Sequence, residues 1–597
     1  MTNRWGIDDS YTDFEGNPHH VPAETRAALL RAMRVDEGAK PKDPPVLVIR
    51  EGQTLRIESP GEVTLEDGGR VAFRNQLPAT LPAGYHSVRF RHTQKRLIVA
   101  PQRCHLEDQR RIWGWSAQLY SVRSRQSWGI GDLGDLSDLA QWSGSLGCGL
   151  ILLNPLHAAL PLLPQNPSPY YPSSRRFRNP LFLNIDALPG ADRADIEPFR
   201  VRARVLNDCR IIDRDEIYRL KMAAVEVLWR DFRGDPEFES YCREQGPSLR
   251  RFAIFSALAE HYGRPWQQWP EEHRNPHSSA LERFAQERES RIRLHEWLQW
   301  QLDRQLSAAS RGLALMQDLP VGFNPDGIDA WEWQDCVASG VSVGAPPDEY
   351  SADGQDWGLP PFIPHKLTES SYEPFVQTVR ATLRHSGGLR IDHVMGLFRL
   401  FWVPAEEKPS AGGYVRYPAD DLLAIVALES QRAGAFVVGE DLGTVEPGVR
   451  EKLAASGVLS YRLAWFEDEP PERFPRLALA AVTTHDLPTI AGVWRGTDPD
   501  GGRLKEKLRK LSGARRQASV ENVVVKTYRR MAEAPSLVIT ASLEDALCVE
   551  ERPNVPGTTT ERPNWSLALP KPIEEIRKDR VVLGIAGALA TPLSSAA

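Results

Sequence analysis

Apolar runs that end in polar residues recur along this 597-residue chain from about Trp113 onward, with helix-like stretches between them. Parallel strands covered on both faces form continuous apolar runs, and a helix usually connects one to the next. The sequence therefore predicts an α/β protein with eight parallel strands, the number found in the (β/α)8 TIM barrel. The eight runs are GWSAQLYSV near Ser116, CGLILLNPLH near Leu152, GLALMQDLPV near Met316, GLRIDHV near Ile391, AFVVGEDL near Val438, LSYRLAWFE near Leu463, AAVTTHDL near Val482 and SLVITASLEDAL near Ile539.

Other patterns precede and interrupt these runs. Residues 1–110 are predicted to form a small β-rich N-terminal module with a short leading helix, because short runs alternate apolar and polar residues between Gly and Pro. Residues 111–590 are predicted to form the barrel domain. Residues 187–310 are too many for one crossover and predict a helical insertion within that domain. The last stretch, Thr591–Ala597, is predicted to be a frayed tail.

Composition excludes several classes of function. The net charge of −6 and the pI of about 6.2 provide no basic surface for nucleic acid or for an anionic membrane. No apolar run of 18 residues appears, and the N-terminus lacks the apolar core of a signal peptide. The six cysteines form no CxxC pair, which argues against a zinc site and fits the reducing cytosol. We therefore expect a cytoplasmic protein without membrane or nucleic-acid partners.

Three carboxylates follow predicted barrel strands. Asp392 follows the run LRI, Glu440 follows FVVG, and Asp486 lies in TTHDL. The active sites of TIM barrels lie at the carboxyl ends of the strands. Each acid alone could be a structural ion pair, but cleavage of a glycosidic bond needs such a set: a nucleophile, a proton donor and an anion that stabilises positive charge.

The neighbours of these acids suggest separate roles. Arg390 lies two residues before Asp392, on the same side of the strand, and should lower the pKa of Asp392 so that it stays ionised as a nucleophile. Glu440 follows an apolar run and precedes Asp441. Poor solvation and a nearby negative charge should raise the pKa of Glu440, as a general acid requires. His393 and His485 are candidate donors to sugar hydroxyls, or else satisfied structural histidines.

The segments RIDHVMG, VVGEDLG and TTHDLPT resemble the catalytic regions of the 4-α-glucanotransferase (amylomaltase, disproportionating enzyme) family, a branch of the α-amylase-like barrels. The resemblance runs from about Trp113 to Ile576, and the N-terminal module is similar to that of the longer bacterial members. Four further segments agree with the family: SWGIGDLGDL, SPYYPSSRRFRNPLFLNID, GAPPDEYSADGQDWGLPPF and ERPNVPGTTTERPNWSLALP.

The resemblance implies a retaining mechanism in which Asp392 is the nucleophile, Glu440 the acid/base and Asp486 the stabiliser of the transition state. It also implies substrate-binding residues, with Tyr170 as a sugar-stacking residue for which Tyr171 is the alternative, and Asp318 as either a site residue or a loop anchor. Asp356 and Trp357 would lie in a flexible loop over the acceptor side. The full substrate-binding set is Arg390, His485, Tyr170, Asp318, His393, Trp357 and Asp356. Ile363 in PPFIPHKL departs from the polar residue expected there, which concerns loop packing only.

Two alternatives remain beside a transferase acting on α-1,4-glucan donors and acceptors. An amylase-type hydrolase would use the same three acids, and a catalytically inactive glucan-binding protein would not need them. Neither a metal nor an organic cofactor is expected, because the chemistry needs none and no calcium-binding pattern occurs. The sequence leaves chain-length preference and oligomeric state open.

Overall fold

The computed structural model describes residues 2–13, 16–106, 111–347, 351, 353–558 and 561–590, so the predicted tail at Thr591–Ala597 lies outside the described residues. The chain divides into two compact units, which are described separately. The first unit is Met1–Asp108, Leu319–Pro325 and Glu332–Ser460, and the second is Gln109–Asp318, Asp326–Trp331 and Tyr461–Ala597. The domain boundaries expected from the sequence stay predictions.

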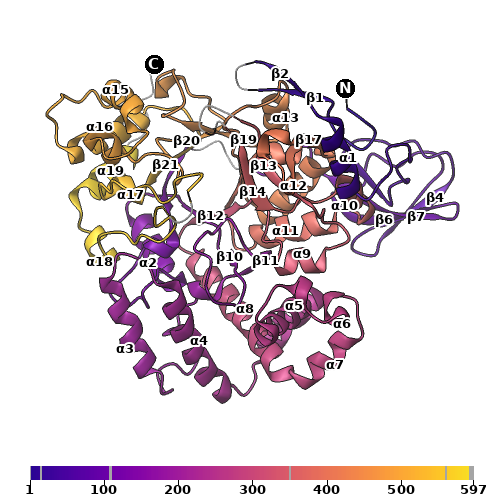
Figure 1. The fold of residues 1–597 in the computed structure, drawn as a ribbon, viewed down its shortest axis with the longest axis horizontal. Helices are drawn as coiled ribbons and strands as arrows, with labels where there is room; N and C mark the ends of the chain where they lie inside the picture. Colours follow the sequence, from indigo (N-terminus) through magenta and orange to yellow (C-terminus); the bar gives the residue numbers. More distant parts are fainter. Residues whose placement is uncertain are drawn as a thin grey trace. The chain divides into compact units, whose positions relative to one another are not determined.

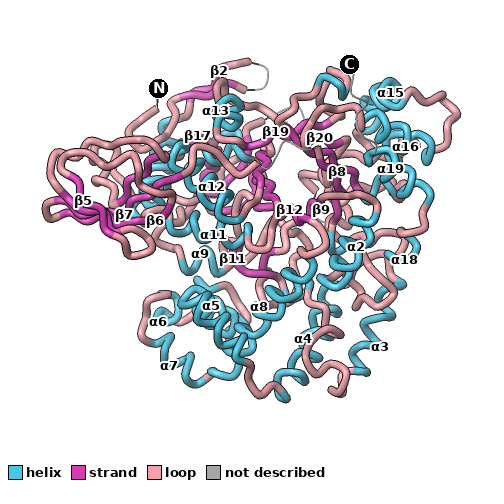
Figure 2. Tube along the Cα trace, turned by 180° about the vertical axis from the view of Figure 1, so that it is seen from behind, coloured by secondary structure: helices cyan, strands magenta, loops and turns pink. Residues whose placement is uncertain are grey.

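Eight strands form a closed barrel in the order β12-β15-β18-β19-β20-β21-β8-β9. Each strand overlaps one of the eight apolar runs, and the predicted (β/α)8 barrel is confirmed. The strands β8, β9 and β12 lie side by side (Figure 2). The bounds are β8 Ile112–Ala117, β9 Leu150–Leu153, β12 Ala314–Leu319, β15 Gly388–Ile391, β18 Phe436–Gly439, β19 Val458–Leu463, β20 Ala478–Ala481 and β21 Val538–Ser542.

The barrel strands are buried along their length, as the continuous apolar runs require. Every residue of β9, β15 and β20 is buried, because parallel strands of this fold pack against side chains on one face and against helices on the other. The helices of the first unit that follow the N-terminal segment are α10 Pro364–Glu369, α11 Glu373–Leu383, α12 Ala419–Ala433 and α13 Val449–Ala455. Helices of the second unit outside the insertion include α2 Leu133–Ser145, α14 Ile490–Arg495, α15 Gly501–Ser512, α16 Val520–Met531, α17 Leu543–Ala546, α18 Ile573–Ile576 and α19 Arg580–Ala590.

A five-stranded sheet with the order β3-β7-β6-β4-β5 follows the leading helix α1, Ala23–Ala32, in the first unit (Figure 1, indigo). Its strands are β3 Val46–Arg50, β4 Gly61–Thr64, β5 Arg70–Phe73, β6 Gly84–Phe90 and β7 Thr93–Ala100. Val63, Val88 and Leu97 belong to the apolar core of this sheet. Ahead of α1, the short strands β1 (Ser10–Thr12) and β2 (Pro18–His20) pair antiparallel.

A second sheet of the first unit corrects one expectation. Its strands are β13 Val341–Ala345, β14 Gln355–Leu359, β16 Arg399–Pro404 and β17 Gly413–Arg416, in the order β14-β13-β16-β17. Asp356 and Trp357 lie in β14, paired antiparallel with β13. Placing these two residues in a loop was therefore wrong, because both lie within β14 and Asp356 is paired with Gly344 of β13.

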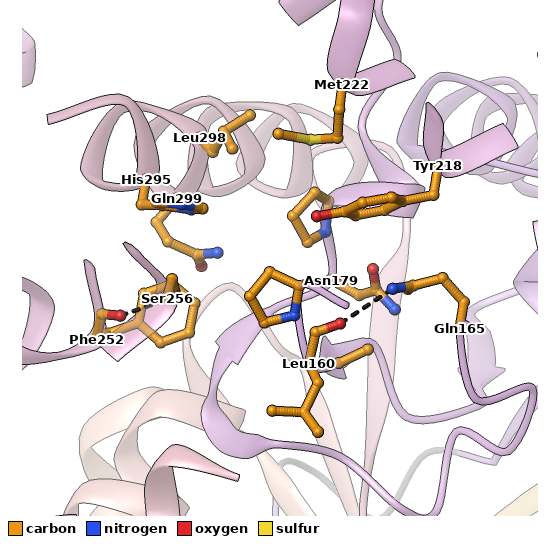
Figure 3. A pocket seen from close by; sticks show the side chains of 13 residues that line it. Leu160, Gln165, Asn179, Tyr218, Met222, Phe252, Ser256, His295, Leu298 and Gln299 are labelled. Atoms are coloured by element: carbon orange, nitrogen blue, oxygen red, sulfur yellow. Dashed lines mark hydrogen bonds between the residues drawn. The ribbon is translucent and has the colours of Figure 1, made fainter. Parts of the chain in front are cut away.

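Six helices fill the segment between β11 (Ser174–Arg178) and β12 (Figure 1, purple to pink). Tyr218 of α4, Ser256 of α5 and His295 of α8 line a small cavity together with Leu160 and Gln165 (Figure 3). Its volume of about 20 Å³ leaves room for about one water molecule and excludes a sugar ring. The helices are α3 Glu197–Val205, α4 Arg214–Asp231, α5 Pro236–Tyr262, α6 Glu271–Arg274, α7 Ala280–Glu287 and α8 Glu289–Ala309.

Among the described residues, none of the helices combines the length and the apolar character needed to cross a membrane.

Candidate active site

Asp392 is the first residue after strand β15, and Arg390 is the last but one residue within it. The Arg390 guanidinium is buried, and its Nη2 lies 3.0 Å from Asp392 Oδ1, which is the expected ion pair. The Asp392 backbone N–H donates to the Leu319 carbonyl at 3.0 Å. The side chain and the backbone of Asp392 are therefore both held at the end of β15. The charge of Asp392 is paired with that of Arg390.

Glu440 follows β18, which lies parallel to β15 with Ile391 opposite Gly439. The Glu440 carboxyl group is held by two backbone donors: the His393 N–H reaches Oε2 at 2.8 Å and the Leu442 N–H reaches Oε1 at 2.9 Å. Glu440 is 9% exposed. The register of two neighbouring strands thus brings Glu440 beside the turn that carries Asp392.

Burial raises the pKa of Glu440 to about 7, and the negative charge of Asp392 adds to the rise while Arg390 and the two backbone donors oppose it. The direction agrees with the sequence prediction, but the neighbouring charge was assigned to the wrong residue. Asp441 pairs instead with Arg450, whose Nε lies 2.9 Å from Asp441 Oδ2. The relevant anion is therefore Asp392, on the adjacent strand.

His393 and Trp357 are in contact within the first unit. Their rings lie edge to face at 5.3 Å, and His393 has a left-handed backbone with φ of 45°. Burial lowers the pKa of His393, which favours the neutral ring. Asp356 is exposed, and it accepts hydrogen bonds from Ser342 Oγ at 2.5 Å and from the Gly358 N–H at 2.8 Å. These contacts keep Asp356 within its own sheet region.

In the second unit, Tyr170, Asp318 and His485 form one cluster. The Tyr170 hydroxyl donates to Asp318 Oδ2 at 2.5 Å, and the Tyr170 and His485 rings lie 4.8 Å apart. Asp318 lies within β12 and is only 2% exposed. Tyr170, rather than Tyr171, carries these two contacts, a choice that the sequence left open.

Asp486 follows His485 in the loop after β20, and His485 Nε2 lies 3.2 Å from Asp486 Oδ2. The second carboxylate oxygen, Oδ1, accepts a hydrogen bond from Asn554 Nδ2 at 2.7 Å. Arg552 donates to the Asp486 carbonyl at 2.9 Å. The Asp486 side chain is nevertheless 40% exposed, so it is fixed in direction and still open to a ligand.

The family model described as 4-alpha-glucanotransferase matches residues 117–572. The chain belongs to the 4-alpha-glucanotransferase family. The 4-alpha-glucanotransferase of Mycobacterium tuberculosis is 37% identical, over 100% of this chain and 98% of that relative. The 4-alpha-glucanotransferase of Haemophilus influenzae is 32% identical, over 83% of this chain and 81% of that relative. The family resemblance seen in the sequence motifs is thereby confirmed.

Two solved structures are similar to this 4-alpha-glucanotransferase family member. The amylomaltase from Corynebacterium glutamicum matches with a TM-score of 0.87 and 30% identity, covering 98% of each chain. The amylomaltase from Streptococcus agalactiae, in complex with acarbose, matches with a TM-score of 0.68 and 19% identity, covering 80% of this chain and 98% of that chain. The second match supports the fold alone.

Three residues beside the candidate site of this family member were missed by sequence reasoning. All three lie in the segment ERPNVPGTTTERPNWSLALP, which resembles the family but from which no individual site residue was predicted. Asn554 and Arg552 hold Asp486, and the Trp565 ring lies 5.3 Å from Tyr170 and 5.1 Å from His485. The richness of this loop in Asn, Pro and Trp was the only signal, because loop-to-strand contacts leave no periodic pattern in a sequence.

Replacing Asn554 by Ala should lower kcat about 10–100-fold with little change in KM. A hydrogen bond to a charged group contributes about 1.5–3 kcal/mol, and about 1.4 kcal/mol corresponds to tenfold in rate. The measurement is the initial rate on maltotriose. Asn564→Ala is the matched control: Asn564 bonds to Thr558 and Val555 in the same loop. If Asn564→Ala lowers kcat equally, general loosening of the loop explains the loss and the positioning role is refuted.

Proposed function

We propose that Asp392, Glu440 and Asp486 act together on one glucosidic bond, by a retaining mechanism with a covalent glycosyl-enzyme intermediate. The activity of the chain is that of its family, 4-alpha-glucanotransferase, and its substrates are glucans. The observation that carries the mechanism is the pair formed by buried Glu440, with a pKa of about 7, and ion-paired Asp392. A proton donor beside an ion-paired carboxylate is the arrangement that double displacement requires.

In the first step, one Asp392 carboxylate oxygen attacks the anomeric carbon while Glu440 gives its proton to the departing glucosidic oxygen. A covalent bond to Asp392 forms as the glucosidic bond breaks. Retaining enzymes hold these two carboxyl groups about 5–5.5 Å apart, and Asp392 and Glu440 follow the paired residues Ile391 and Gly439 of neighbouring strands. Arg390 orients the attacking carboxylate through the ion pair at 3.0 Å.

In the second step, ionised Glu440 takes the proton from the 4-hydroxyl of an acceptor glucan, whose oxygen then displaces Asp392. We propose that Asp486 stabilises the positive charge that develops on the ring in both steps. Its place after β20 supports this role, since the carboxyl ends of all strands in a closed parallel barrel face one rim. Tyr170, Asp318, His485, His393 and Trp357 are proposed to contact the sugar. The hydrogen bonds of exposed Asp356 run to Ser342 and Gly358, and it is left out of this set.

Water in place of the acceptor hydroxyl would make the enzyme a hydrolase, and the family membership favours transfer. Incubation with pure maltotriose tests the choice. We expect a ladder of longer chains together with glucose or maltose, because each transfer lengthens one chain as it shortens another. The measurement is chain-length analysis against an Asp392→Asn control. Products that are all shorter than maltotriose would contradict the proposal.

We also propose that short maltooligosaccharides serve as both donor and acceptor, and that the protein works in the cytoplasm. All six cysteines are free, which agrees with a reducing compartment. These points of detail stay predictions.

A further inference from the structure

A hollow of about 420 Å³ lies in the first unit, at the N-terminal segment of the chain. Strand β1 forms one wall, the start of β16 and the end of β17 form another, and the loop Thr444–Pro447 forms a third. This loop begins four residues after Glu440. The volume falls within the range of about 300–1,000 Å³ that is usual for small-molecule sites. The lining residues are Thr2, Asp8, Ser10, Tyr11, Thr12, Asp13, Arg399, Arg416, Thr444, Val445, Glu446 and Pro447.

The charges at the hollow are mixed and paired. Arg416 Nε lies 2.7 Å from Asp8 Oδ1, and Arg416 Nη2 lies 2.9 Å from Glu446 Oε1. Arg399 Nη1 lies 3.1 Å from Glu446 Oε1 and 3.7 Å from Asp8 Oδ2. With Asp13 included, three carboxylates face two guanidinium groups. The three carboxylates would repel an anion, and the two guanidinium groups would repel a cation. The charges along the walls therefore favour a neutral ligand.

Arg399 has hydrogen-bonding capacity that the rest of the site does not use. Its guanidinium carbon lies 3.8 Å from the centre of the Tyr414 ring, a cation–π contact that helps to hold the group in place. It forms the two ion pairs above, but it donates no side-chain hydrogen bond within the described part of the chain. Arg399 is also largely buried, with a side chain 11% exposed. Preorganised donors at a polar hollow indicate a ligand that accepts hydrogen bonds.

We propose that this hollow is a second glucan-binding site, built around Arg399 and lined by none of the candidate active-site residues. Sugar hydroxyls are neutral, and each both donates and accepts, so they match a wall of alternating carboxylates, guanidinium groups and Ser or Thr hydroxyls. Recognition is by hydrogen bonds rather than by stacking, because the Tyr11 ring is already stacked on His19 at 5.2 Å. The choice of a glucan rests on the proposed function.

The same contacts also hold the N-terminal segment, since the Asp8 N–H donates to the Tyr414 carbonyl and the Arg416 N–H donates to the Gly6 carbonyl. A purely structural clamp is therefore the competing explanation. Arg26 offers a matched control, because it pairs with Asp9 of the same segment at 2.9 Å and does not line the hollow. Arg26→Met loosens the segment without removing a donor from the hollow.

The test is isothermal titration of maltotriose into Asp392→Asn protein, which binds the sugar without turnover. We expect two molecules per chain, one in each site. Adding Arg399→Met should reduce this to one, as should Thr12→Trp, which fills the hollow from β1, whereas adding Arg26→Met should leave two. Amide exchange should slow in Ser10–Thr12 and Thr444–Pro447 when maltotriose binds, and this protection should disappear with Arg399→Met.

The second site is refuted if only one molecule binds to the parent protein, if two molecules still bind after Arg399→Met, or if Arg26→Met removes one molecule. Displacement of bound maltotriose from the hollow by inorganic phosphate would also overturn it, since an anion would then be the better ligand. Failure of the proposed function gives a different result. The unsubstituted enzyme would then form no longer chains from maltotriose, while the number of maltotriose molecules bound per protein chain would stay the same.

Discussion

Replacing Asp392 by Asn should lower kcat/KM on maltotriose by on the order of 10⁴-fold or more, because the amide cannot form the covalent bond to the sugar. Asn keeps the size of the side chain, and Arg390 can still donate to the amide oxygen. The protein should therefore stay folded and still bind the substrate. Initial rates and a binding titration measure the two effects separately.

Asp421→Asn is the control for this experiment. Asp421 is a partly buried carboxylate of the same unit and lies at the start of α12. It accepts a hydrogen bond from the Tyr372 hydroxyl. Its replacement should leave kcat/KM within about threefold, since surroundings of this kind affect stability more than chemistry. Substantial transfer by Asp392→Asn, at a rate near that of Asp421→Asn, would exclude Asp392 as the nucleophile.

Replacing Glu440 by Gln should lower kcat/KM on maltotriose by about 10²–10⁴-fold, the usual contribution of general acid–base catalysis. It should also change the pH profile. In the native enzyme the Glu440 pKa of about 7 lies above the ordinary value of 4.5. The carboxyl group therefore keeps its proton below about pH 7 and loses it above, so kcat/KM should fall as the pH rises through about 7. That alkaline limb should be absent in Glu440→Gln.

A maltosyl fluoride donor separates proton donation from other roles of Glu440. Fluoride leaves without a proton, so the first step of Glu440→Gln should recover much of its rate with this donor, whereas Asp392→Asn should stay inactive. Release of fluoride measures the step directly. If Glu440→Gln lost the same factor in rate with maltosyl fluoride as with maltotriose, Glu440 would not be the proton donor.

The sequence predicted the features of this fold that follow from burial. Apolar runs mark the strands because both faces of a barrel strand are covered, and the acids that follow Ile391 and Gly439 mark the strand ends. The same rule predicted the raised pKa of Glu440, because an apolar run leaves the next carboxyl group poorly solvated. Local pairing was predictable too, since Arg390 and Asp392 lie two residues apart at the end of one strand.

Contacts between distant segments could not be predicted. Asp441 was chosen as the neighbour of Glu440 because it is adjacent in sequence, whereas the anion that acts on Glu440 is Asp392, brought there by strand pairing. The strand β14 was missed because Gly, Asp and Ser around Trp357 are typical of a loop, and only pairing with β13 makes the segment a strand. Asn554 reaches Asp486 across 68 positions of sequence, a separation at which no local pattern exists.

The backbone N–H groups of His393 and Leu442 both donate to the Glu440 carboxyl group, and this limits how the pH dependence of the enzyme can be changed by mutation. Every residue except proline carries a main-chain N–H, so point substitutions other than to proline leave both donors in place. An engineer who wishes to move the pH optimum therefore has to work through the Arg390 charge or through the apolar surroundings that keep water from the acid. Insertions that shift the register between β15 and β18 would break the bond from the His393 amide, whereas the Leu442 amide lies in the same loop as Glu440 and would move with it. The loops beyond these strands are therefore the safer places for redesign.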